Sequence, residues 1–145
     1  MTQIDFYVLQ SHTPEAWYDF SCKLIEKIIS KGNKIVVLTE NINAANTLDS
    51  LLWEFRPESF IPHAIWGSDD AKDASLPVII SHDEVPDNAK DVLLNLCQEI
   101  PSDYSKFARV AQVVNQEPNR LAALRRLYAS FIERGHSVNV HKLDR

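Results

Sequence analysis

The sequence predicts an α/β fold, with helices on both faces of a central sheet whose strands are mostly parallel or mixed. Two observations carry this prediction. Amphipathic helical patterns alternate along the chain with short apolar runs, and most of these runs are continuously apolar. A continuous apolar run is typical of a strand covered on both faces, as in a parallel sheet. The expected architecture is three-layered, α/β/α, and 145 residues suit one domain, 1–145.

The N-terminal half is expected to hold two strands and two helices in alternation. A serine or threonine cap followed by Pro14 opens the first helix, because the amide that proline lacks at the first helical position would have no partner within the helix in any case. Gly32 is expected to end that helix in the left-handed conformation. Asn41 or Asn43 caps the second helix. The expected ranges are a strand at 4–9, a helix from the segment 11–15 to residue 32, a strand at 35–38 and a helix at 41–53.

The C-terminal half continues the alternation and ends on a helix and a strand. Gly135 is expected to close the last helix, as Gly32 closes the first. Residues 68–75 form the most loop-like stretch. The expected ranges are strands at 78–80, 92–96 and 110–114, a short helical turn at 104–107, a helix at 118–134 and a strand of alternating character at 137–143.

An aromatic-rich segment follows the second helix. That helix should stop before Arg56, because the residue that precedes a proline is pushed out of the α region. Apolar residues nevertheless continue through a stretch bounded by Pro57 and Pro62. These apolar side chains either pack into the domain's own hydrophobic core or form a surface that another protein covers. The residues of this aromatic segment are Trp53, Phe55, Phe60, Ile61 and Pro62.

The helix at 118–134 combines a buried stripe with positive charge in an otherwise acidic protein. Its arginines are Arg120, Arg125, Arg126 and Arg134. They form either a solvated basic face or a seat for an acidic peptide, since arginine forks match carboxylates and nearby apolar residues can hold an aromatic side chain.

Composition excludes several classes of protein. The net charge of −5 argues against a domain whose main task is to grip a phosphate backbone, although a local basic patch is compatible with it. Cys22 and Cys97 are far apart and are expected to be buried thiols in a reducing cytoplasm. We expect neither a signal peptide nor a membrane-spanning segment.

The topology is expected to be Rossmann-like but without a nucleotide-binding loop. The chain has three glycines, which never occur close together, and a phosphate-binding loop needs several.

His82-Asp83-Glu84 is the best cluster for acid–base chemistry or a divalent ion, and is expected to be a solvated loop. A small α/β hydrolase or nucleotide-dependent enzyme using that cluster is the alternative function. No metal or cofactor is expected, and His63 is expected to hydrogen-bond its loop.

The central segment resembles a known family. Leu48-Asp49, Leu52-Trp53 and the run Pro57-Glu58-Ser59-Phe60-Ile61-Pro62-His63 are similar to a motif of the chi subunit of bacterial DNA polymerase III, an accessory component of the clamp-loader assembly. The likeness extends to the opening strand, Ile4 to Leu9, and to the end of the chain, from Arg125 through Gly135 to Val140.

The resemblance implies a cytoplasmic, non-catalytic subunit with two protein partners. The first is the psi subunit, which the aromatic segment would contact, chiefly through Trp53 and Phe60. The second is the acidic C-terminal tail of single-stranded DNA-binding protein. A repair helicase is a further partner that the aromatic segment could bind in place of psi. The residues expected to hold the tail are Arg120, Leu124, Arg125 and Tyr128.

The tail site departs from the family pattern at two positions. Leu121 and Ala129 stand where the family has lysines, so the expected tail site carries less positive charge than in the family. Arg120 and Arg126 are neighbouring arginines, but adjacent helical residues point about 100° apart, so they do not replace those lysines automatically. Direct DNA binding is not required by this function.

Overall fold

All seven strands among the described residues run parallel in one sheet, in the order β3-β4-β2-β5-β6-β1-β7. The computed structural model describes residues 2–55, 61–73, 75–86 and 91–143. The strands are β1 Gln3–Val8, β2 Ile35–Leu38, β3 His63–Ile65, β4 Val78–Ser81, β5 Val92–Asn95, β6 Arg109–Val114 and β7 Val138–Lys142. The sheet is thus wholly parallel, within the predicted class of mostly parallel or mixed.

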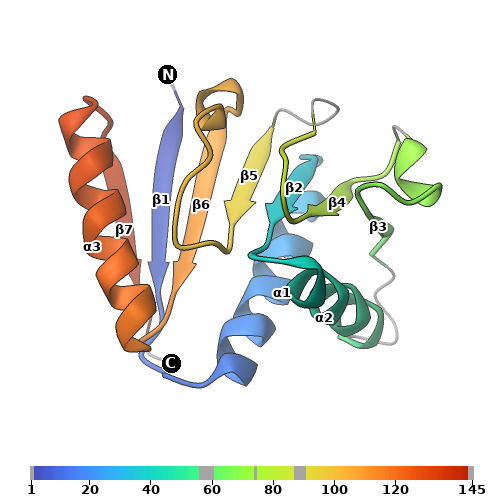
Figure 1. Ribbon diagram of the computed structural model, residues 1–145, viewed down its shortest axis with the longest axis horizontal. Coiled ribbons are helices and arrows are strands. Elements are labelled where there is room, and N and C mark those ends of the chain that lie inside the picture. The colour runs from blue at the N-terminus through green and yellow to red at the C-terminus, as the bar shows by residue number, and fades with distance from the viewer. Residues whose placement is uncertain (1, 56–60, 74, 87–90, 144–145) are drawn as a thin grey trace.

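Helices cover both faces of the sheet, as predicted. The helices are α1 Pro14–Ser30, α2 Ile42–Glu54 and α3 Pro118–Glu133, with short 3-10 helices η1 Asp70–Lys72 and η2 Tyr104–Lys106. In Figure 1, α3 lies beside β7 and β1 at one end, and α1 and α2 lie together toward the other end. Strand residues alternate between two cores. In β2, Ile35 and Val37 pack under α1 and α2, whereas Val36 and Leu38 share a core with α3.

Helix ends follow the predicted signals, with one exception. Thr13 caps α1 by accepting a hydrogen bond from the amide of Ala16, and Asn41 caps α2. Helix α2 ends at Glu54, before Arg56, as expected from Pro57. The cap of α3 was not predicted: the carboxylate of Glu117 accepts hydrogen bonds from two amides of its first turn.

Two short elements were missed by the sequence analysis. Strand β3 contains only three residues, and η1 lies inside the stretch read as loop, 68–75. Three residues are too few to establish a period, so the sequence offers no signal for β3. The remaining helices and strands begin and end within a few residues of their predicted bounds.

Candidate partner-binding surfaces

The aromatic segment divides between surface and core. Trp53 is 50% exposed at the end of α2, whereas Ile61 is 2% exposed and belongs to the core beneath α1 and α2. Phe55 is half-buried against that core, and Pro62 is partly exposed. Phe60 lies outside the described residues. Ile61 therefore supports this surface from beneath, which corrects the expectation that it contacts a partner directly.

His63 fixes the base of this surface. Its Nδ1 lies 2.6 Å from the carbonyl oxygen of Ile61, and its Nε2 lies 3.1 Å from a carboxylate oxygen of Asp49. The Trp53 ring packs on the imidazole, with 4.3 Å between ring centroids. The prediction that His63 hydrogen-bonds its loop is confirmed. The indole is consequently held in place while one side of it remains open to solvent.

A groove with acidic sides lies next to Phe55, between the first turns of α1 and the end of α2. Its volume is 620 Å³. Tyr18, Leu51 and Phe55 give it an apolar lining. Its charged lining residues are Glu15, Asp19 and Glu54. This groove extends the aromatic surface along α1.

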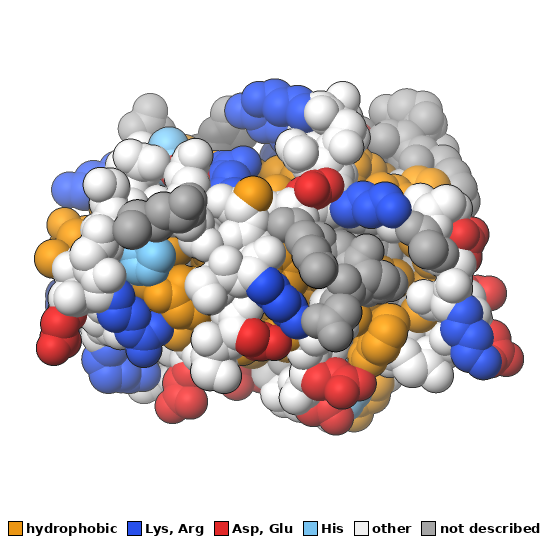
Figure 2. Space-filling view, turned by 90° about the horizontal axis from the view of Figure 1, so that it is seen from above, with side chains coloured by type: hydrophobic (Ala, Val, Ile, Leu, Met, Phe, Trp, Pro, Cys, Tyr) orange, Lys and Arg blue, Asp and Glu red, His pale blue; other side chains and the backbone are white. Residues whose placement is uncertain are grey.

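The second surface lies on the outer side of α3. Tyr128 is 42% exposed, and its ring meets Phe6 edge-on with 6.2 Å between centroids. Arg125 is exposed nearby on the same side of the helix, since residues three apart are neighbours on a helix. Leu124 is half-buried against the core of α3. In Figure 2, Lys and Arg side chains gather at the end of the molecule that carries α3 and β7.

Arg120 does not join this surface. Its guanidinium carbon lies 3.7 Å from the centroid of the Trp17 ring, and burial lowers the pKa of the Arg120 guanidinium. It stacks on α1, while Arg125 and Tyr128 face outward from α3. The expectation that Arg120 helps to hold the tail stays a prediction, and the contact with the Trp17 ring would have to be given up or shared for Arg120 to bind a tail.

The polar cluster at 82–84 borders a cavity of 540 Å³, but its side chains do not form an acid–base pair. His82 Nδ1 lies 3.9 Å from the nearest Asp83 carboxylate oxygen, too far for a hydrogen bond. Glu84 accepts a hydrogen bond from the indole N–H of Trp66. Among the described residues, no three His, Cys, Asp or Glu side chains converge to hold a metal ion.

The cysteines are free thiols, as predicted. Cys22 is buried and Cys97 is partly buried. Burial raises the pKa of each thiol to about 12. Neither is therefore a ready nucleophile near neutral pH.

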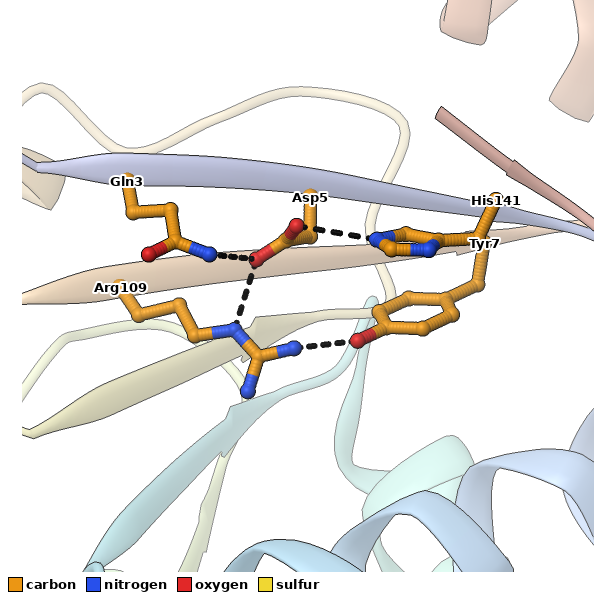
Figure 3. Close-up of polar contacts among 5 residues, drawn as sticks. All are labelled: Gln3, Asp5, Tyr7, Arg109 and His141. Atoms are coloured by element: carbon orange, nitrogen blue, oxygen red, sulfur yellow. Dashed lines mark hydrogen bonds and ion pairs between the residues drawn. The ribbon is translucent and has the colours of Figure 1, made fainter. Parts of the chain in front are cut away.

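A buried polar network was missed by the sequence analysis. Asp5, in the apolar strand β1, accepts hydrogen bonds from Gln3 and Arg109 and contacts His141 (Figure 3). Burial by itself would raise the pKa of Asp5, but the hydrogen bonds to His141 and Arg109, with the Arg109 charge, leave that pKa below 3.8. An aspartate inside an otherwise apolar strand is the sequence signal that could have found this network.

The chain is similar along nearly its whole length to one family. The model for "DNA polymerase III chi subunit, HolC" matches residues 1–139. DNA polymerase III subunit chi of Pseudomonas aeruginosa is 36% identical over 145 residues, covering 100% of this chain and 99% of that protein. The Escherichia coli protein of the same name is 24% identical over 144 residues, covering 96% and 97%.

Solved structures share the fold at low sequence identity. Domain 2 of the DEAD-box helicase Mss116p, bound to an RNA duplex, matches 99% of this chain with a TM-score of 0.64 and 11% identity. Dbp5 of S. cerevisiae bound to Gle1 matches 98% with a TM-score of 0.68 and 10% identity. This chain spans 64% and 42% of those two chains. At such identities the likeness concerns the fold alone.

Within the described residues, no helix has the length and apolar character needed to cross a membrane.

Proposed function

Because the chain belongs to the family of DNA polymerase III chi subunits, we propose that it links the clamp-loader assembly to DNA coated with single-stranded DNA-binding protein. One surface binds a psi subunit, and the other binds the acidic C-terminal tail of the coating protein. It acts in the bacterial cytoplasm as an adaptor and catalyses no reaction itself. The observation that carries the proposal is the pair of exposed aromatic side chains, Trp53 and Tyr128, on separate helices.

Trp53 is proposed as the main anchor for psi. A half-exposed indole held on a buried imidazole offers a large contact area with few torsions left to freeze. Phe55 continues this surface into the acidic groove. Pro62, which is partly exposed, is proposed as a further contact. Phe60 is proposed as a second anchor from the resemblance alone.

Replacing Trp53 with alanine should weaken psi binding. Loss of an interface anchor costs about 2 kcal/mol, or roughly thirtyfold in affinity. Isothermal titration of the folded variant with purified psi checks this expectation. Ile42→Ala is the matched control, because Ile42 is an exposed apolar residue of the same helix. Equal affinities of the Trp53 variant and the wild type would remove Trp53 from the interface.

The tail site is proposed to centre on Arg125 and Tyr128. The exposed Arg125 guanidinium makes no ion pair within the described part of the chain, and the Tyr128 ring offers an exposed apolar surface. Leu124 is half-buried against the core one helical turn before Tyr128. Salt should weaken this contact, because the charges involved are exposed.

Arg125→Ala should lower affinity for an acidic tail peptide about tenfold, since a charge-assisted hydrogen bond contributes about 1.5 kcal/mol. Fluorescence anisotropy with a labelled peptide measures the change. Arg126→Ala is the control, because Arg126 has the same charge but points about 100° away. Ala129→Lys should have the opposite effect to Arg125→Ala, because it restores a family lysine at an exposed position. Unchanged affinity in both Arg125→Ala and Ala129→Lys would exclude this site.

A further inference from the structure

A second groove lies on the face of the sheet opposite α3, between α1 and strands β1, β6 and β7. Its volume is 360 Å³, within the range of small-ligand sites. Phe20, Leu24 and Ile28 of α1 form its apolar side. Among the described residues no carboxylate side chain lines it. The polar and charged residues that line it are Lys23, Lys27, Lys31, Asn33, Arg109, Tyr7 and His141.

The lysines of this basic groove form one row. Lys23 and Lys27 stand four residues apart, so they project from the same side of α1 about 6 Å from one another. Lys31 is the residue that caps the end of α1 and lines the same groove. Lys23 is paired with Asp19 at 2.9 Å. Lys27 and Lys31 are exposed and make no ion pair with any residue in the described ranges. The chain has a net charge of −5, so these two lysines make the surface beside the cavity positive in a protein that is negative as a whole.

The strand side of the groove is rigid. Asp5, only 2% exposed beneath it, holds Arg109 Nε at 2.7 Å and His141 Nε2 at 3.0 Å. Arg109 also donates to the hydroxyl of Tyr7. The rings of Tyr7 and His141 stack with 4.7 Å between centroids and 13° between planes (Figure 3). A fixed pair of rings therefore stands at the β7 edge of the groove, opposite the row of lysines.

We propose that this basic groove binds a nucleoside phosphate of single-stranded nucleic acid. Lys27 and Lys31 contact phosphate oxygens, and a base packs against the paired rings of Tyr7 and His141. A positive groove with aromatic rings alongside is the usual arrangement for binding single strands. The guanidinium of Arg109 already donates hydrogen bonds to Asp5 and Tyr7, so it cannot form the paired hydrogen bonds that arginine makes with a carboxylate. The ligand therefore meets the lysine ammonium groups, and we expect a phosphate to fit better than a carboxylate.

This groove is distinct from both proposed partner surfaces. Lys27 and Lys31 lie at the C-terminal end of α1, whereas the groove beside Phe55 lies at its N-terminal end. Arg125 and Tyr128 lie on the other face of the sheet. Binding at this groove can consequently be tested independently of the psi and tail contacts.

Fluorescence anisotropy of a labelled oligothymidylate with the full chain tests the proposal. The Lys27→Ala/Lys31→Ala variant should bind more weakly, and the slope of log affinity against log salt should fall by about 1.4, since each phosphate contact contributes about 0.7. The control is Lys72→Ala/Arg126→Ala, which removes two exposed positive charges elsewhere. Amide chemical shifts should change at Lys27, Lys31 and His141 on titration of the wild-type protein.

Three results would overturn the assignment. The first is equal weakening in the control variant, which would mean non-specific attraction. The second is thymidine monophosphate binding as tightly as the oligothymidylate, which would mean that no strand is recognised. The third is a polyglutamate peptide that binds through Lys27 and Lys31 while the oligothymidylate does not, which would mean a peptide site.

Discussion

At the scale of single residues, buried or partly buried charged side chains contact other side chains that stabilise them. Asp5 is an example, because Arg109 and His141 compensate a carboxylate that burial alone would disfavour. Arg120 is similarly committed, over the ring of Trp17. Arg125, Lys27 and Lys31 are, by contrast, exposed, and they are the charges that the proposals assign to binding.

Asp5→Asn should destabilise the protein by about 2 kcal/mol, since it removes charge-assisted hydrogen bonds to Arg109. Thermal or urea unfolding at neutral pH measures the loss. The folded-state pKa of Asp5 is lowered, so its contribution is present above the unfolded pKa of about 3.8 and disappears as pH falls through the folded pKa. The difference between wild type and variant should therefore shrink below pH 3.8. A difference that stays constant to lower pH would contradict this account.

Residue-level features could be predicted when their partners are local. The hydrogen bonding of His63 and the free thiols followed from sequence. The Asp5 network did not, because Arg109 is 104 residues away and His141 is 136 residues away, and only strand order brings them together. Nor could sequence alone show that Ile61 faces inward while Trp53 faces outward.

At the scale of elements, local chemistry decides where helices start and stop. Gly32 and Gly135 end α1 and α3 with φ of +85° and +88°, a conformation that other residues adopt only at a cost. Such signals are local, which is why the ends of these helices could be predicted. Strand β3 could not, because its three residues owe their conformation to pairing with β4.

Gly135→Ala should destabilise the protein by about 1 kcal/mol through backbone strain alone. A Cβ atom at this position would meet nothing within 4 Å, so no clash contributes. Gly135→Asn is the matched control and should cost less, because asparagine tolerates the left-handed region better. Urea unfolding of both variants provides the comparison. A larger loss for asparagine than for alanine would rule out the strain explanation.

At the scale of the whole molecule, a wholly parallel sheet separates the proposed binding surfaces. Helix α2 carries Trp53 over one face, and α3 carries Tyr128 over the other. In the proposed function, the chain holds two partners at once, and linking two modest contacts raises the effective concentration of one partner near the other. The fold class and the family followed from sequence, whereas the separation of the surfaces required the strand order.

The most direct measurement of the proposed adaptor function is a bridging assay. Single-stranded DNA-binding protein is immobilised, and capture of psi is recorded by surface plasmon resonance with and without this chain. The account predicts that psi is captured only when the chain is present, and that either Trp53→Ala or Tyr128→Ala reduces the capture. Each variant should keep its affinity for the partner that the substituted residue does not contact. Competition between psi and the coating protein for the chain would contradict the account.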